Sequence, residues 1–405
     1  MSALAASSIL TVPSVAEPFS AAPCALRRTE AHHSEGLDTW NPAYTRPTRT
    51  LDAVMVFLSF PDSVPNTRPA ELAADHFPAT SRFFEQASYG RFTLRPHPLN
   101  HWIRMPRPST SYAIKRDWNA ARRSTYLRDA FSVADKDVDF SRYDVVYFVA
   151  DPDAPGVDSD ATKVVNLDTP VHVDGKDVRR VVTVFEKHPP DRLVLAHETG
   201  HVFDLPDLYH RPVDGKGDWD TYVGDWDLMG SQFGLAPDLF AWHKWKLGWL
   251  DPRQVRCVRG TGPTRLTLEP LAAGEEHRGK GISGDPSFGL GDGVKLAVVR
   301  TGADSALAFE ARGPAGNDRG VCRQGVLVYR VRSGAESGGG PIQVVDAHPH
   351  TEACWEGSVN PSLADAPVAL GETFTVPGSQ GVKVEVEARA ASGAWTVKIT
   401  PGSAV

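Results

Sequence analysis

The sequence predicts two folded parts, an α/β domain over residues 51–250 and an all-β, sandwich-like domain over residues 251–405. In the first part, continuous apolar and β-branched runs, typical of strands buried on both faces, alternate with helical spacing. After Asp251 the chain changes to short alternating segments separated by Gly, Pro, Asp and Ser turns. Residues 1–50 are rich in Ala, Ser and Pro and have little periodicity, so we expect a flexible leader or a remnant pro-segment.

Composition excludes two classes of partner. The 405 residues are 41% hydrophobic, as in an ordinary globular protein, and their formal net charge is −7. A nucleic-acid partner would require a basic face, which this acidity argues against. No apolar run approaches the length of a bilayer span. We therefore expect a monomer with no nucleic-acid partner and no transmembrane segment.

The order of elements in the first part indicates a twisted sheet with helices packed on it. Its last strand leads into a helix that we expect to begin after Pro189-Pro190-Asp191, with Asp191 capping the free N–H groups. Strands are predicted at 51–60, 91–99, 143–150 and 181–185, and helices at 70–87, 112–133 and 236–250. The last of these helices carries a stripe of tryptophans, which we expect to face the core, with His243 in a structural role; a stacking platform for sugars is the alternative.

The helix after Asp191 contains the sequence His197-Glu198-Thr199-Gly200-His201, an H-E-x-x-H motif. Residues four apart share one face of a helix, so both imidazoles can bind one ion. Zn²⁺ takes nitrogen ligands in a tetrahedral shell, and in catalytic sites it keeps a water whose pKa falls to roughly 7. Glu198 is placed to accept the proton of that water as a general base. Gly200 is unfavourable inside a helix and suggests that another backbone packs closely there.

Spacing predicts the third metal ligand. In the pattern H-E-x-x-H-x-x-G-x-x-H, a glycine ends the helix and the chain turns back to the metal. Those two positions are Asp204 and Asp207 here. Asp tolerates the left-handed conformation that the turn requires, and Pro206 prevents further helix. We expect Asp207 to be the third ligand, with Asp204 as the less favoured substitute; a turn or calcium-binding role for Asp207 is the alternative.

A methionine beneath the metal is expected at Met229, which lies in a turn rich in Gly, Asp and Ser. A buried methionine that fills a core gap is the competing interpretation. The motifs HETGHVFDLPDLY and VGDWDLMGS and the tryptophan-rich segment 236–250 together resemble the immune inhibitor A family of secreted zinc metallopeptidases. Upstream landmarks of the same resemblance are Phe60-Pro61-Asp62, Ser88-Tyr89-Gly90 and Tyr143-Asp144-Val145-Val146.

The resemblance implies a metzincin-like α/β catalytic domain in which zinc is bound by His197, His201 and Asp207. It also implies Glu198 as the general base and Met229 below the metal. The implied activity is a secreted, zinc-dependent endopeptidase acting on proteins or peptides. The alternative is a zinc-binding but inactive adhesion or recognition protein that uses its C-terminal β domain.

Two departures from the family pattern bear on this activity: Asp204 replaces the usual glycine, and His210 stands where an acidic residue often follows the tyrosine. Tyr209 and Tyr222 are candidates for stabilising the oxyanion of the reaction, by proximity in sequence alone.

The sequence also bears on structural calcium and on the location of the protein. The acidic stretches 151–160 and 214–227 invite structural Ca²⁺, although neither has EF-hand spacing, and solvated or capping aspartates are the alternative. An extracellular location is expected, although the leader is a weak secretory signal because no basic residue precedes Arg27.

Among the four cysteines we favour a disulfide between Cys322 and Cys354, which leaves Cys24 and Cys257 unpaired. Cys24 is interpreted as an incidental thiol or as a thiolate that caps the zinc of a latent form. His32 and His33 are expected to be solvated.

Overall fold

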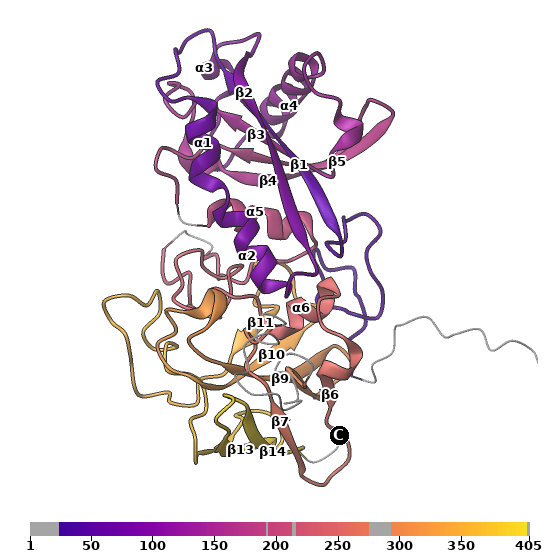
Figure 1. Cartoon of the computed structure of the whole chain (residues 1–405), viewed down its shortest axis with the longest axis vertical. Helices are drawn as coiled ribbons and strands as arrows, with labels where there is room; N and C mark the ends of the chain where they lie inside the picture. Colours follow the sequence, from indigo (N-terminus) through magenta and orange to yellow (C-terminus); the bar gives the residue numbers. More distant parts are fainter. Residues whose placement is uncertain (1–23, 192, 213–215, 275–292, 403–405) are drawn as a thin grey trace, which may run out of the picture.

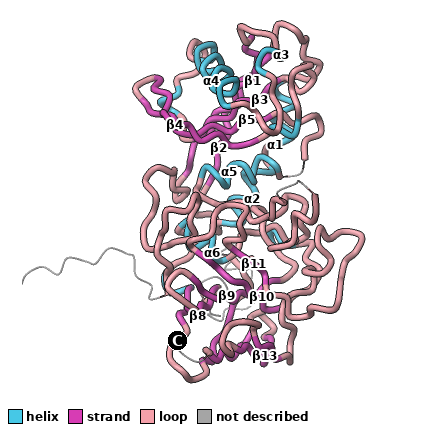
Figure 2. Tube along the Cα trace, turned by 180° about the vertical axis from the view of Figure 1, so that it is seen from behind, coloured by secondary structure: helices cyan, strands magenta, loops and turns pink. Residues whose placement is uncertain are grey.

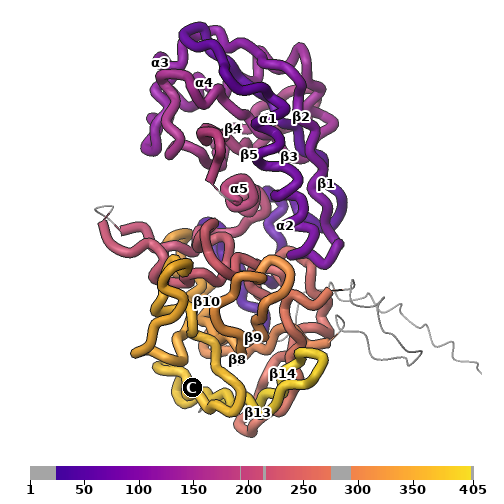
Figure 3. Tube along the Cα trace, turned by 60° about the vertical axis from the view of Figure 1, so that its left-hand side comes forward, coloured from indigo at the N-terminus to yellow at the C-terminus, as the bar shows by residue number. Residues whose placement is uncertain are grey.

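The computed structural model describes residues 24–191, 193–212, 216–274 and 293–402. An α/β half lies above a half built from two further sheets, and helix α5 (Val194–Val202) lies where the two halves meet (Figure 1; Figure 3). Among the described helices, none has the length and apolar character that a membrane span requires.

The α/β half is built on a five-stranded sheet of order β2-β1-β3-β5-β4. Four strands run parallel, and the edge strand β4 runs antiparallel to β5. The predicted strands are found, but β4 was missed because a polar interruption coincides with a register shift between Asn166 and Val171. The bounds are β1 Thr50–Ser59, β2 Thr93–Arg104, β3 Val145–Ala150, β4 Lys163–Val173 and β5 Lys176–Val184.

Strand β1 shows why this sheet has helices on both faces. Its odd residues, such as Met55 and Phe57, join one hydrophobic cluster, and its even residues, such as Val54 and Val56, join another. Successive strand residues point to opposite faces, so a continuous apolar run must be covered twice. Helix α5 packs on the first face and α4 on the second (Figure 2). The helices are α1 Pro69–His76, α2 Ala79–Ala87, α3 Ser109–Tyr112 and α4 Ala120–Ala134.

Three helix predictions differ from the structure. The helix expected over 70–87 is two helices, because Pro78 lacks an N–H and forces Phe77 into an extended conformation. The helix expected over 112–133 begins only at Ala120, where the Asn119 side chain accepts hydrogen bonds from the first N–H groups. The helix expected over 236–250 is the shorter α6, Ala241–Leu247.

The start of α5 is also not the predicted one. Asp191 does not cap the helix; its carboxylate accepts a hydrogen bond from Gln232 Nε2 at 3.2 Å. The helix is instead tied to β3 through Thr199. Tyr147 donates its hydroxyl proton to Thr199 Oγ1 at 2.9 Å, and Thr199 donates in turn to the carbonyl of Leu195 at 2.6 Å.

The second half contains a five-stranded sheet of order β11-β10-β9-β8-β6 and a four-stranded sheet of order β12-β13-β14-β7 (Figure 2). Residues from both sheets, among them Phe309, Val328, Trp395 and Val397, form one buried cluster. The strands β6 and β11, of three residues each, are too short to show an alternating pattern in the sequence. The bounds are β6 Val255–Cys257, β7 Thr264–Leu268, β8 Leu296–Arg300, β9 Ser305–Arg312, β10 Gly325–Arg332, β11 Ile342–Val344, β12 Thr373–Thr375, β13 Lys383–Arg389 and β14 Trp395–Thr400.

Packing is continuous across residue 250, where we predicted a domain boundary. One hydrophobic cluster includes Leu195 and Met229 near the motif, Trp242 of α6, and Leu327 and Tyr329 of β10. Two of the tryptophans of the expected stripe, Trp242 and Trp249, are fully buried, as a core-facing role predicts. The two halves therefore share a core along the side of α5 that faces away from the sheet β2-β1-β3-β5-β4.

The flexible leader predicted for residues 1–50 is wrong over residues 24–49, which are packed against the rest of the chain; residues 1–23 lie outside the described part. Cys24 forms a disulfide with Cys257, so neither interpretation of Cys24 as a free thiol holds. Cys322 and Cys354 form the disulfide that we favoured. The segment contains few apolar residues, and its partners lie far away in sequence, which is why its composition alone indicates flexibility.

His33 and Glu35 are the buried polar residues that hold this segment. His33 is not solvated as predicted: its Nδ1–H donates to Asp204 Oδ1 at 3.0 Å. Glu35 accepts a hydrogen bond from His243 Nε2 at 2.8 Å, and the other ring nitrogen of His243 donates to Asp227 at 3.1 Å. Burial alone would lower the pKa of His243, but the carboxylates of Glu35 and Asp227 raise it to about 9. His243 is thus a buried cation between two carboxylates.

Replacement of Glu35 tests whether this segment is part of the fold. Glu35→Ala leaves the charge of His243 only half compensated, and we expect the free energy of unfolding to fall by about 3–5 kcal/mol. The measurement is urea unfolding followed by circular dichroism. Glu30→Ala, at an exposed position of the same segment, is the control and should cost less than about 0.5 kcal/mol. Equal, small losses of unfolding free energy for both variants would show that the segment does not contribute to the stability of the fold.

Candidate metal centre

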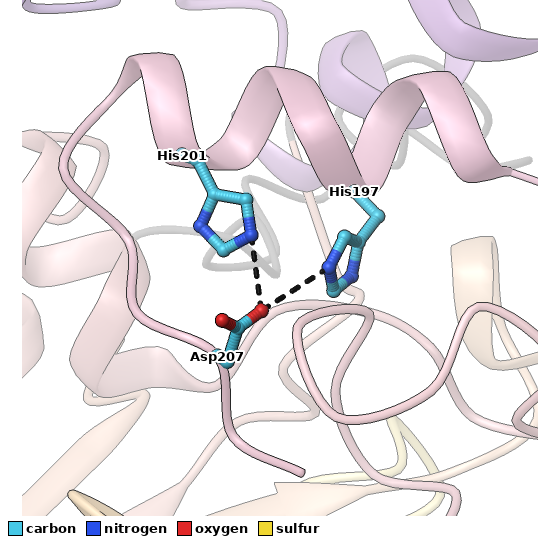
Figure 4. Close-up of side chains that lie close together, drawn as sticks. All are labelled: His197, His201 and Asp207. Atoms are coloured by element: carbon cyan, nitrogen blue, oxygen red, sulfur yellow. Dashed lines mark ion pairs between the residues drawn. The ribbon is translucent and has the colours of Figure 1, made fainter. Parts of the chain in front are cut away.

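Three side chains that the sequence analysis named as ligands converge at the end of α5 (Figure 4). One ligand atom from each of His197, His201 and Asp207 can be chosen so that all lie within 4.8 Å of one another. Asp207 Oδ1 lies 3.0 Å from His201 Nε2 and 3.4 Å from His197 Nε2. The histidines share a helix face, and the chain turns back after α5 to bring the aspartate beneath them.

Hydrogen bonds on the far side of each imidazole fix its protonation. His197 Nδ1–H donates to the carbonyl of Leu228 at 3.0 Å, and His201 Nδ1–H donates to the carbonyl of Leu205 at 2.8 Å. A carbonyl oxygen only accepts, so the Nδ1 atoms carry the protons. The Nε2 atoms that face Asp207 are therefore the ones that can present lone pairs to an ion, as in metal sites where a backbone carbonyl orients the histidine.

These residues fit a divalent zinc ion. Ligand atoms about 2.0–2.2 Å from a tetrahedral ion stand roughly 3.3 Å apart, close to the two distances observed. Asp207 Oδ1 is buried and accepts no hydrogen bond of regular geometry within the described residues. Burial alone would raise the pKa of Asp207, but the neighbouring His201 and His197 hold it well below its ordinary value. An ionised, buried oxygen with no hydrogen-bond donor has the property expected of a metal ligand.

Asp207 is held in place by the second half of the chain. Ser337, in the loop between β10 and β11, donates its hydroxyl proton to Asp207 Oδ2 at 3.2 Å and accepts the Asp207 N–H at 2.8 Å. The next residue, Gly338, donates its N–H to the carbonyl of Asp207 at 2.9 Å. The contact of this loop with Asp207 is not predicted from the sequence, because nothing in Ser337-Gly338-Gly339-Gly340 marks a contact with a residue 130 positions away.

Glu198 is buried beside the three ligands. Its Oε2 accepts the N–H of Val164, on edge strand β4, at 2.7 Å. Burial raises the pKa of Glu198, while the neighbouring His197 and His201 oppose that shift. A carboxylate with a raised pKa is a better proton acceptor and donor near neutral pH than an ordinary glutamate.

Met229 lies directly beneath α5. A Cβ added at Gly200 would stand 2.5 Å from Met229 Sδ, too close for any real side chain. The expectation that another backbone packs at Gly200 is therefore wrong in detail, since a side chain fills the space. The Met229 carbonyl accepts the N–H of Leu208, which joins the methionine turn to the segment that carries Asp207.

Asp204, the departure from the glycine pattern, adopts the left-handed conformation with φ of 66°. Its carboxylate does not join the group of His197, His201 and Asp207. It accepts hydrogen bonds from Arg28 at 2.8 Å and His33 at 3.0 Å. Its carbonyl accepts one from Lys246 Nζ at 2.6 Å. Burial alone would raise the pKa of Asp204, but His33, Lys246 and Arg28 lower it to about 2. The turn that glycine would make is thus made by an aspartate anchored on the N-terminal segment.

Tyr209 and Tyr222, the two candidates for stabilising the oxyanion, differ in their ring contacts. The Tyr209 ring lies 6.2 Å from the His197 ring, centroid to centroid, with the planes 18° apart, and its centroid lies 5.5 Å from that of the Trp219 ring. Burial and the charge of Asp207 raise the pKa of Tyr209, so it remains a hydrogen-bond donor. Tyr222 instead packs against His210, with centroids 5.2 Å apart.

Two carboxylates of the acidic stretch 214–227, considered above for calcium, have protein hydrogen-bond partners instead. Asp225 accepts hydrogen bonds from Ser358 Oγ and the N–H of Leu235, and Asp227 accepts the N–H groups of Met229 and Phe240. Within residues 24–191, 193–212, 216–274 and 293–402, His197, His201 and Asp207 form the single group of three or more His, Cys, Asp or Glu side chains that meets the same spacing.

Comparisons with known proteins do not identify the chain. No family model matches it, and no curated protein sequence matches it. A solved structure of wild type OgpA from Akkermansia muciniphila is similar over 89% of this chain and 97% of that chain, at 12% identity and a TM-score of 0.28. A likeness at that TM-score carries no argument about fold or activity.

The anchoring of Asp204 predicts a pH-dependent contribution to stability. Asp204→Asn keeps the left-handed turn but removes the charge, and we expect it to lower the free energy of unfolding by about 2 kcal/mol at pH 7. Because the folded-state pKa lies below the ordinary value, the contribution is full at neutral pH and is lost as the pH falls from about 4 through about 2. Urea unfolding of both proteins across this range is the measurement.

The control for this prediction is Asp168→Asn, at an exposed position on β4, which should leave stability unchanged at every pH. A difference between wild type and Asp204→Asn that is the same at pH 7 and below pH 3 would contradict the anchoring role.

Proposed function

We propose that this chain is a zinc-dependent endopeptidase of the metzincin type that cleaves peptide bonds in proteins. The observation that carries the proposal is the convergence of His197, His201 and Asp207, with both Nε2 atoms directed at a buried carboxylate oxygen, beside the buried carboxylate of Glu198. Such a set of two imidazoles, one carboxylate and an adjacent glutamate suits hydrolysis of an amide.

Zinc held by these three side chains would supply a Lewis acid for the scissile carbonyl and would make a water acidic near neutral pH. Glu198 takes a proton from the attacking water, whose oxygen adds to the carbonyl carbon. As the C–N bond breaks, Glu198 returns that proton to the leaving nitrogen, so the products are an amine and a carboxylic acid, which ionises at neutral pH. Tyr209, protonated and next to His197, is the candidate donor to the oxyanion.

Strand β4 favours an extended peptide as substrate. It is an edge strand, and Val164 directs its N–H out of the sheet toward Glu198. An extended chain can add to such an edge through main-chain hydrogen bonds. A peptide bound there would run past Glu198 and the three ligands, which is the placement that peptide cleavage requires.

Further features support a location outside the cell. The chain has two disulfides, and such bonds persist in oxidising compartments. We propose a secreted, monomeric enzyme; structural Ca²⁺ remains part of the proposal for the acidic stretch 151–160.

The first test is hydrolysis of casein by wild type and Glu198→Ala, each with its zinc content determined. We expect about one zinc per chain in both and a loss of about 10²–10⁴-fold or more in rate for the variant, because only the proton transfer is removed. Glu85→Ala, at an exposed position of α2, should cleave like wild type. Zinc in both proteins without cleavage by either would favour the inactive recognition protein, and absence of zinc from both would overturn the site.

A second test concerns the support of the third ligand. Ser337→Ala removes the hydrogen bonds that orient Asp207, and we expect the affinity for zinc to fall about 10–100-fold, as for other partners of metal ligands. Competition with a chelator of known affinity measures this. Ser392→Ala, in the exposed turn before β14, is the control, and equal affinities for the two variants would show that Ser337 does not support the site.

A further inference from the structure

Four basic side chains gather around Lys163, in a chain whose net charge is −7. We call Arg116, Arg123, Lys163 and Arg211 the basic rim. Lys163 donates a hydrogen bond from Nζ to the carbonyl of Arg116, which joins β4 to the segment before α4. Arg211 reaches the same segment through an ion pair with Asp117 at 3.3 Å.

The basic rim adjoins the residues of the proposed reaction. Lys163 directly precedes Val164, whose N–H donates to Glu198 at 2.7 Å. The Arg116 guanidinium carbon lies 4.9 Å from the centroid of the Trp219 ring, and Trp219 packs in turn against Tyr209. Because Tyr209 lies against His197, a continuous series of contacts joins the rim to the first ligand.

The charges of the rim are only partly compensated. Burial and the charge of Arg123 lower the pKa of Lys163, with Arg211 acting in the same direction, and the opposing carboxylates are those of Glu198 and Asp117. Asp218 and Asp220 lie on the same loop as Trp219, where Asp218 accepts the N–H of Asp220. Two carboxylates, those of Glu198 and Asp117, thus oppose a rim of four basic side chains. Lys163 is half-buried, and partial desolvation strengthens its interaction with an incoming charge.

We propose, on the basis of the function proposed above, that the preferred substrates are peptides with an Asp or Glu side chain close to the scissile bond, bound by the basic rim. A peptide that adds to the edge of β4 at Val164 passes Lys163 one residue away. A carboxylate side chain on that peptide would face an ammonium and up to three guanidinium groups at the mouth of a partly desolvated site. A cleft lined by one sign of charge raises both the affinity and the association rate of oppositely charged ligands.

The experiment uses peptide pairs that differ only in Glu or Gln, with the variable residue moved through each position on either side of the cleavage site. Binding is measured by fluorescence anisotropy on zinc-loaded Glu198→Gln protein, and cleavage is measured on wild type. At one or more positions we expect Glu to exceed Gln about tenfold in both measurements at low ionic strength. The advantage should shrink as salt is raised, because exposed charges are screened.

Variants identify the side chains responsible. Lys163→Met should bring the Glu-to-Gln ratio close to one, and Lys163→Glu should reverse it; Arg211→Gln, at an exposed position, should reduce it in part. Lys176→Met is a matched control, because Lys176 also lies in this sheet and donates from Nζ to a main-chain carbonyl, that of Tyr143. It should leave the ratio unchanged.

The outcomes separate this inference from the proposed function. Cleavage of both peptides with a ratio near one at every position would leave the peptidase intact and overturn the acidic preference, as would equal effects of Lys163→Met and Lys176→Met. A Glu preference in binding without cleavage of either peptide would support the rim and overturn the peptidase. Failure to bind or cleave either peptide would overturn both.

Discussion

The arrangement of the candidate metal centre depends on one buried carboxylate, Asp227. One of its oxygens accepts the N–H of Met229, and the other accepts the N–H of Phe240 and the Nδ1–H of His243. These bonds fix the turn beneath α5, so that the carbonyl of Leu228 faces His197 and orients its ring. The same carboxylate joins this turn to α6. A small shift of Asp227 would therefore move the methionine turn and the first ligand together.

The N-terminal segment, residues 24–49, supplies hydrogen-bond partners to the residues that support the candidate metal centre. Glu35 supplies the second carboxylate for His243, and Arg28 and His33 supply the donors for Asp204. A glycine would adopt the left-handed conformation after α5 at little cost in conformational energy. An aspartate there also buries a charge, which needs hydrogen-bond and charged partners. The segment 24–49 provides those partners. The aspartate at position 204 can therefore replace the usual glycine because the packed segment 24–49 supplies the hydrogen-bond donors that its buried carboxylate needs.

Sequence reasoning succeeded where the information is local and failed where it is distant. His197, His201 and Asp207 lie within eleven residues; helix periodicity brings the two histidines together, and the turn expected at Asp204 brings Asp207 to them. Strands such as β1 and β3 were recognised because their residues are apolar on both faces. The partners that finish the site, Glu35 and Ser337, are polar residues whose roles depend on contacts across more than a hundred positions. No composition or periodicity encodes such contacts.

This distribution of contacts bears on where the function resides. The first half of the chain carries all three proposed ligands and Glu198, which suggests an autonomous catalytic unit ending near residue 250. Yet the loop at Ser337 orients Asp207, and the buried Arg312 on β9 donates to the carbonyls of Trp226 and Ala236 beside the methionine turn. A fragment cut at residue 250 would leave those carbonyls and the Asp207 carboxylate without their donors, at a cost of about 1–3 kcal/mol for each buried group. The candidate metal centre therefore depends on the chain from the N-terminal segment through the second half, and the loop between β10 and β11 helps to hold Asp207, the proposed third ligand.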